Sequence, residues 1–298
     1  MSEKRIRGVV AAVATPLLED FAPDVGRLIP HCRALLEEGC DGINLLGTTG
    51  EATAFSVEQR LAVMRSVASS GLPLDRFMVG TGVCALAETV QLTRAACELG
   101  FAGALVLPPF FYPDPSNDGL VAYVSAVVRR VSHPRLRLYL YHIPQNTGVP
   151  WHRDVFQQLK MRHPEELAGL KDSSGVAGYA KDAAQLADFD VFPSSEAWLG
   201  DARASGFAGC ISATVNLTAR VSQDAWSLSG TAEGEAAARK AGDLRTLFTK
   251  HSLVSAIKSA LATRYRDDNW ARISLPALPL DLDSRRILWE AFAARLAS

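Results

Sequence analysis

Lys171 stands where an apolar run meets a polar turn, and its amine is the first candidate for chemistry in this chain. The sequence of residues 170–175 is Leu-Lys-Asp-Ser-Ser-Gly, so we expect a strand to end here and a helix to follow. A lysine after such a run buries much of its stem, and burial favours the neutral amine, which attacks ketones to form a Schiff base. The plainer alternative is a lysine that ends a strand and pairs with Asp172, and this segment alone favours that alternative.

The composition is that of a soluble globular protein. The 298 residues are 48% hydrophobic and 21% charged, which is enough for one large domain or two ordinary ones. The formal net charge of -1 and the lack of a dense Lys/Arg run give no electrostatic footprint for nucleic acid or an anionic membrane. No signal-peptide core follows Met1 and no apolar run is long enough to span a bilayer, so we expect a cytoplasmic location.

The cysteines and histidines do not indicate a disulfide framework or a metal site. The five cysteines are scattered, odd in number and without CxxC spacing, which favours reduced, buried thiols. Cys84 follows a predicted strand, and we expect it to serve in packing. The six histidines show no clustered ligand spacing, so no metal is expected.

Strands and helices are predicted to alternate along most of the chain. Short β-branched or apolar runs predict eight strands, at residues 9–14, 42–46, 77–80, 103–107, 136–141, 167–170, 190–192 and 209–213. Segments with helical spacing lie between them, at residues 25–38, 57–69, 87–99, 120–131 and 154–161. These segments are long enough to connect parallel strands.

This alternation predicts an α/β fold, a (β/α)8 TIM barrel, with an open doubly wound sheet as the alternative. No GxGxxG follows the first strand, which weakens that alternative. We expect residues 1–221 to form the barrel and residues 222–298 to form a helical extension packed on it. Apolar spacing in the extension predicts helices at residues 237–248, 256–265 and 287–296, with a proline-rich interruption at 275–279.

In such barrels the working residues follow the carboxyl ends of the strands. The turn after the second strand, residues 47–51, has the sequence Gly-Thr-Thr-Gly-Glu, and its backbone N–H groups and hydroxyls suit a carboxylate or phosphate. A plain helix-capping turn is the alternative. Tyr141 ends the fifth strand near Lys171 on the sixth, where proton transfer is the sharper hypothesis and a core tyrosine the plainer one.

Together these segments resemble the dihydrodipicolinate synthase and N-acetylneuraminate lyase family of pyruvate-dependent class I Schiff-base aldolases. Other members are 2-keto-3-deoxygluconate aldolase and 4-hydroxy-2-oxoglutarate aldolase. The resemblance runs nearly end to end, and these stretches carry it in order: Gly8 to Ala11 with Thr15-Pro16, residues 47–51 with Ser56 to Arg60, the Tyr141 and Lys171 segments, and Gly209 to Ala213 with Asn216.

The resemblance implies catalytic roles for Lys171, Tyr141 and Thr48. Lys171 would form an imine with the 2-oxo group, Tyr141 would carry the proton, and Thr48 and Thr49, in the turn that begins at Gly47, would hold the carboxylate. The cationic imine draws electrons from the adjacent carbon–carbon bond, so no metal or cofactor is implied. The expected partners are pyruvate, or another 2-oxo acid, and an aldehyde. A homotetramer built as a dimer of dimers is also implied.

Two positions depart from the pattern of dihydrodipicolinate synthases. Phe111 stands where those enzymes usually carry a tyrosine that completes a relay across a dimer interface, and Tyr112 is expected to point the other way. Asn146 stands where an arginine usually holds the aldehyde's carboxylate. The stretch 144–148 is more similar to 4-hydroxy-2-oxoglutarate aldolases. We therefore expect a 2-keto-3-deoxy sugar acid or 4-hydroxy-2-oxoglutarate as substrate, and not lysine biosynthesis as the main role.

The acceptor pocket is expected after strands four, seven and eight. Ser195 and the backbone of Ile211 are predicted to line it, and Glu196 either receives a sugar hydroxyl or is an exposed helix-start glutamate, the better-favoured alternative. The other residues expected near its walls are Phe110, Phe111, Ser194 and Trp198.

Other functions stay open on the sequence alone. A true dihydrodipicolinate synthase, a dehydratase of 3-deoxy sugar acids and an aldolase share the lysine. A catalytically silent oxo-acid-binding protein is conceivable because the relay tyrosine is missing. A barrel enzyme of phosphate esters would need a basic or glycine-rich site after strands seven and eight, and residues 194–196, Ser-Ser-Glu, do not provide one.

Overall fold

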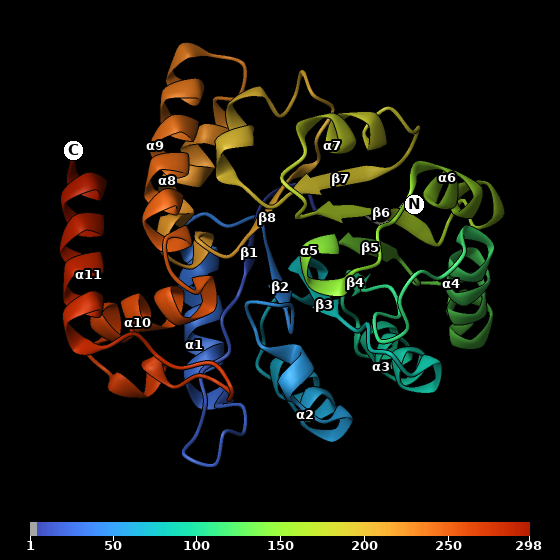
Figure 1. Cartoon of the computed structure of the whole chain (residues 1–298), viewed down its shortest axis with the longest axis horizontal. Helices are drawn as coiled ribbons and strands as arrows, with labels where there is room; N and C mark the ends of the chain where they lie inside the picture. Colours follow the sequence, from blue (N-terminus) through green and yellow to red (C-terminus); the bar gives the residue numbers. More distant parts are fainter. Residues whose placement is uncertain (1–4) are drawn as a thin grey trace.

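A computed structural model describes residues 5–298, and it contains a nearly closed barrel of eight parallel strands (Figure 1). The strands are β1 (Gly8–Ala12), β2 (Gly42–Leu45), β3 (Phe77–Gly80), β4 (Gly103–Val106), β5 (Leu138–His142), β6 (Leu167–Asp172), β7 (Asp190–Pro193) and β8 (Gly209–Ser212). Neighbours in sequence pair in parallel from β1 to β7, and β8 pairs with β1. Between β7 and β8, the Ala208 amide donates to the Val191 carbonyl at 2.9 Å.

Helices connect the strands and extend the chain beyond the barrel. They are α1 (Val25–Glu37), α2 (Val57–Ala68), α3 (Leu86–Leu99), α4 (Asn117–Val131), α5 (Pro144–Thr147), α6 (Arg153–Arg162), α7 (Ala177–Ala183), α8 (Val215–Ser227), α9 (Ala232–Thr249), α10 (Leu253–Tyr265) and α11 (Leu282–Ala297). Four 3-10 helices add η1 (Ala52–Ala54), η2 (Leu74–Arg76), η3 (Glu196–Asp201) and η4 (Asp268–Ala271). None of the helices within residues 5–298 is long and apolar enough to cross a membrane.

The predicted barrel and its helical extension are confirmed, and the strand bounds differ from the prediction by two residues at most. The helices differ more at their N-termini, because capping side chains set the starts. Ser116 accepts a hydrogen bond from the Gly119 amide, and α4 starts three residues before the predicted start. Thr231 accepts from the Gly234 amide, and α9 starts five residues before the predicted start. Helices α5, α7 and α8 lay outside the predicted set. The predicted boundary between residues 221 and 222 falls within α8, and the division into two domains stays a prediction.

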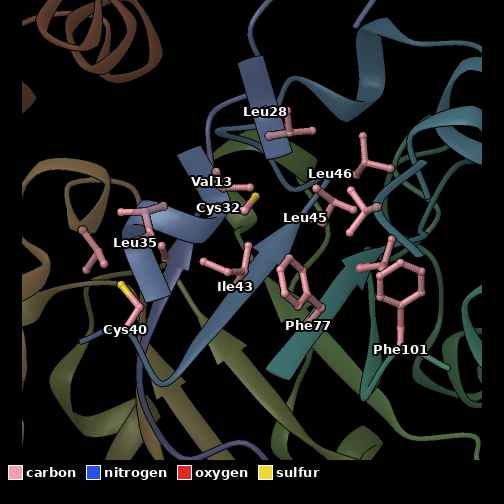
Figure 2. Packing of buried hydrophobic residues seen from close by; sticks show 14 of the residues in the cluster. Val13, Leu28, Cys32, Leu35, Cys40, Ile43, Leu45, Leu46, Phe77 and Phe101 are labelled. Carbon is pink, nitrogen blue, oxygen red and sulfur yellow. The ribbon is translucent and has the colours of Figure 1, made fainter. Parts of the chain in front are cut away.

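Two apolar layers hold the barrel. Its interior is filled by alternate residues of the strands, including Met78, Leu105, Tyr139 and Phe192. The opposite faces of β1 to β3 pack against the surrounding helices, and Figure 2 shows part of that layer, with Ile43 and Phe77 among the labelled side chains. Both faces are buried, so the strands read as continuous apolar runs. Such runs bounded by turn residues are what made them predictable.

Helices α9, α10 and α11 lie to one side of the barrel, next to α1 and α8 (Figure 1). A separate apolar cluster joins α9, α10 and α11 around Phe248, Leu261 and Phe292. Asn216 in α8 ties this region to β1, because its side chain accepts from the Ala14 amide at 3.1 Å and donates to the Ala12 carbonyl at 2.8 Å. The extension reaches the same rim itself, because Lys258 in α10 pairs with Glu51 after β2 and Arg272 donates to the Leu17 carbonyl after β1 at 2.8 Å.

Candidate active site

Lys171 and Tyr141 face each other on neighbouring strands. They are register partners in β6 and β5, and their side chains are only 3% and 4% exposed. The Lys171 ammonium lies 4.3 Å from the centre of the Tyr141 ring. Because side chains alternate along a strand, Asp172 points to the other face, where its carboxylate accepts from the Ser174 amide at 2.9 Å. The plainer alternative, a Lys171–Asp172 pair, is not what the structure contains.

The turn after β2 brings a third side chain, Thr48, to this pair. The Thr48 hydroxyl donates to the Tyr141 hydroxyl at 3.2 Å, and the buried Thr49 follows it. The turn closes through the Ala52 amide, which donates to the Gly47 carbonyl at 3.3 Å. It passes very close to β3, because a Cβ on Gly80 would lie 2.1 Å from the Leu46 carbonyl oxygen. Glycine is therefore needed there for the turn to reach Tyr141.

The surroundings of Tyr141 favour its ionised form. Burial alone would raise the pKa of this phenol, but the charge of Lys171 and hydrogen bonds with Thr48, Ser173 and Lys171 outweigh it, and the pKa is lowered from its usual value of 10.0. Ser173 was not among the predicted site residues. Its position two residues after Lys171, on the same side of an extended segment, is the signal that identifies it. The arrangement suits a tyrosine that gives and takes a proton.

A cavity of about 200 Å³ opens beside Tyr141. Four of the predicted residues line it, and they are Gly47, Thr48, Tyr141 and Asn146. Phe110, expected near the pocket walls, also lines it. The other lining residues were outside the predicted set, and Arg60, Ile143 and Thr147 are among them. The cavity is therefore built by the loops after β2, β4 and β5, as a barrel with its site at the carboxyl ends of its strands requires.

Five predicted site residues are not part of this cavity lining, and they are Lys171, Thr49, Phe111, Ser195 and Ile211. Phe111 is 74% exposed and meets Tyr112 edge to face, with ring centres 5.3 Å apart. Ser195 caps η3 by accepting from the Ala197 amide at 3.4 Å. Ile211 is buried in the barrel interior, in the same apolar cluster as Tyr141. Their proposed contacts with substrate stay predictions.

The expectation that Glu196 is an exposed helix-start residue is wrong. Its side chain is 0% exposed and accepts hydrogen bonds from the hydroxyls of Thr214 and Thr218, the latter at 3.3 Å. The Arg245 guanidinium lies 3.6 Å from the second carboxylate oxygen. The buried charge is thus paired by groups from α8, its N-cap and α9. Trp198, also expected near the pocket, packs against Phe207.

The cysteines are free thiols, and four of the five are buried. Cys84 is exposed, so the expectation that it serves in packing is wrong. Burial raises the pKa of Cys32 to about 12 and that of Cys97 to about 11, which leaves both thiols uncharged near neutral pH. Within residues 5–298 there is no group of three or more His, Cys, Asp or Glu side chains placed to hold a metal ion.

Known proteins resemble this chain over nearly its whole length. The model of the Dihydrodipicolinate synthetase family matches residues 5–294. A protein named "Uncharacterized DapA-like lyase" from Chloroflexus aurantiacus is 34% identical over 98% of this chain and 97% of its own length. Among solved structures, dihydrodipicolinate synthase from Agrobacterium tumefaciens is 27% identical, with a TM-score of 0.87 over 96% of this chain and 98% of the other. The synthase from Acinetobacter baumannii, complexed with pyruvate, is 26% identical, with a TM-score of 0.86 over 97% and 99%.

Proposed function

The chain belongs to the Dihydrodipicolinate synthetase family and is a lyase of the class I aldolase type, and from this premise we propose that it makes or breaks a carbon–carbon bond of a 2-oxo acid through an imine on Lys171. The observation that carries the proposal is the position of the Lys171 ammonium, 4.3 Å from the centre of the Tyr141 ring and buried at the end of β6. A lysine amine held there faces the phenol needed for its proton transfers.

The reaction follows from these groups. The amine attacks the 2-oxo carbon, and loss of water gives an imine whose cationic nitrogen withdraws electrons from the next carbon–carbon bond. Tyr141 gives its proton to the carbinolamine hydroxyl, which leaves as water. The tyrosinate, favoured by the lowered pKa, then accepts the proton of the C4 hydroxyl as the aldehyde forms, and Tyr141 returns that proton to the enamine carbon. The backbone and hydroxyls of the Gly47–Thr48–Thr49 turn bind the carboxylate. Nothing else charged is needed at the reacting carbon.

We propose a 2-keto-3-deoxy sugar acid as the substrate. Asn146 lines the cavity and is exposed to it, and its amide offers both a donor and an acceptor to substrate hydroxyls. An amide does not offset the charge of a second carboxylate as an arginine would. Condensation with aspartate semialdehyde, which carries such a carboxylate, is therefore the less favoured reaction.

A second candidate, 4-hydroxy-2-oxoglutarate, is favoured by Arg60. Among the cavity-lining residues of the described part of the chain, Arg60 is the one with a charged side chain. Its guanidinium donates to the Gly80 carbonyl at 2.8 Å, and its Nε has no hydrogen-bond partner within residues 5–298. A substrate with a distal carboxylate would supply one if it reached that wall of the cavity.

The rate of pyruvate release tests the substrate. Purified protein is supplied separately with 2-keto-3-deoxygluconate and with 4-hydroxy-2-oxoglutarate, and condensation of pyruvate with aspartate semialdehyde is measured alongside. The proposal expects kcat/KM for the sugar acid to exceed the other two by at least about tenfold, a difference of about 1.4 kcal/mol. Equal or faster condensation with aspartate semialdehyde would contradict it.

We also propose that the protein works in the cytoplasm as a homotetramer, a dimer of dimers. The exposed aromatic pair Phe111 and Tyr112 supports a subunit contact at the loop after β4, because large aromatic side chains are usually shielded from water. Light scattering coupled to size exclusion measures the mass of the assembly. A monomer at micromolar concentration would contradict the tetramer.

A further inference from the structure

We propose that Glu51 and Lys258 are positioning residues that set the carboxylate-binding turn from the C-terminal extension. The inference rests on the proposed function, because it concerns the affinity of the turn for a 2-oxo acid. Glu51 ends the Gly-Thr-Thr-Gly-Glu turn, and Lys258 lies in α10, 207 positions further along the chain. The two side chains form a salt bridge inside the protein.

The Lys258 ammonium is enclosed. The residue is 0% exposed, and the Glu51 carboxylate accepts a hydrogen bond from its ammonium. The other carboxylate oxygen accepts from the Ser274 amide at 2.7 Å, so the extension holds both oxygens of this carboxylate. A buried charge that lost its partner would be costly, which makes this contact hard to open.

The backbone of Glu51 explains why such a hold is useful. Its φ of 55° lies in the left-handed region, which a residue with a side chain seldom adopts. A conformation of this kind persists only where the surroundings impose it. Its amide donates to the Thr48 carbonyl at 3.1 Å, so the position of Glu51 fixes the residue that reaches Tyr141.

The consequence concerns binding more than bond making. Thr48 and Thr49 are the groups proposed to receive the substrate carboxylate. Lys171 and Tyr141 stand on β6 and β5, and within residues 5–298 no hydrogen bond or ion pair joins these strands to the side chains of the pair. Loosening the turn should weaken the hold on the carboxylate more than it slows the bound reaction, in which Tyr141 would lose only its contact with Thr48 and keep Lys171 and Ser173. A purely structural role would instead reduce the fraction of folded protein, which lowers kcat and leaves the affinity unchanged.

A pyruvate titration followed by borohydride reduction tests this, with the modified fraction read from intact mass. The double variant Glu51→Gln with Lys258→Met removes both charges and keeps an acceptor for Ser274. Glu51→Asp keeps the charge but shortens the arm by one methylene. Both are expected to raise the half-saturating pyruvate concentration, the double variant by about tenfold or more, with kcat within about threefold of wild type.

Arg264→Met is the matched control. Arg264 lies on the same helix and pairs with Glu38, the C-cap of α1, which precedes β2, whereas the turn follows β2. Its loss should leave the half-saturating concentration unchanged. An unchanged value in either folded Glu51 variant, as judged by circular dichroism, would overturn the inference. If wild-type protein formed no adduct at any pyruvate concentration, the proposed function would fall first, and the inference with it.

Discussion

Lys171 and Lys258 are both buried lysines, but their partners differ. Lys258 donates to a carboxylate that is itself held by the extension, and burial lowers its pKa while Glu51 opposes that effect. Lys171 faces the ring and hydroxyl of Tyr141, and within the described residues its ammonium forms no salt bridge. A carboxylate partner fixes an ammonium in place, whereas a phenol can exchange a proton with it.

This fold places its candidate nucleophilic amine beside a phenol at the end of a strand. Both lysines are in apolar surroundings, so burial by itself does not identify the nucleophile. What separates them is the neighbour and the place, since Lys171 stands at the carboxyl end of a strand and Lys258 in a helix outside the barrel.

The largest expected effect is on activity. Lys171→Met removes the amine and keeps the length of the side chain, so kcat should fall by at least about 10⁴-fold because no imine can form. Steady-state pyruvate release measures it. The variant should stay folded, because the substitution removes a buried ammonium that has no carboxylate partner and so leaves no buried charge unpaired. Residual activity within a hundredfold of wild type would contradict the assignment of Lys171 as the nucleophile.

Tyr141→Phe should have a smaller effect on the same assay. The ring that packs beside Lys171 stays, and the hydroxyl that contacts Thr48 is lost. We expect kcat to fall by about 10² to 10⁴-fold, the range for one proton-transfer group. Imine trapping with pyruvate should persist more strongly than turnover. Unchanged kcat would remove Tyr141 from the proton path.

Stability should show the opposite order for the two lysines. Lys258→Met leaves the Glu51 carboxylate buried without its cation and should lower the free energy of unfolding by about 3 to 5 kcal/mol. Lys171→Met should change it little or raise it. Urea unfolding of both variants at neutral pH gives the two values. The same loss in both would mean that the partners do not matter as argued.

His31 is a third buried basic residue, and its hydrogen-bond partners are neutral. Its ring nitrogens contact the Tyr265 hydroxyl at 2.8 Å and the Asn216 side chain at 2.9 Å, and burial lowers its pKa from 6.5 to about 4. The unfolded chain therefore takes up this proton below pH 6.5, while the folded protein does so only near pH 4.

That difference should cost stability as the pH falls through this window. Between pH 7 and pH 5 the free energy of unfolding should drop by about 2 kcal/mol on account of His31. Urea unfolding of wild type and His31→Gln at both values measures it, and the variant should lose correspondingly less. An equal loss in both proteins would assign the acid sensitivity to other groups.

The sequence predicted the barrel and the meeting of Lys171 with Tyr141 for a physical reason. Each strand is a local apolar run, and consecutive strands of such a barrel are neighbours, so order along the chain gives adjacency in space. The left-handed backbone of Glu51 and its bond to Lys258 depend instead on a contact between residues that are 207 positions apart in the sequence. Local patterns do not identify the partner in such a contact. The lysine in the apolar run at 253–262 indicated only that a buried partner was needed.

The prediction that Glu196 is exposed was wrong for a related reason. A glutamate at the start of a helix is usually solvated, and the prediction followed that local rule. The groups that bury it, Thr214, Thr218 and Arg245, come from segments that close over β7 and β8 only in the folded chain. Sequence reasoning from neighbours in the chain could not place them.

The most direct test of the central claim is to identify the residue that carries the imine. Protein incubated with pyruvate is reduced with borohydride, digested and mapped by mass spectrometry, with Lys171→Ala as the control and Lys258 as an internal comparison. The account predicts a reduced pyruvyl adduct on Lys171 and none on Lys258, and no adduct in the variant. A folded wild-type protein that forms no adduct, or forms one elsewhere, would contradict it.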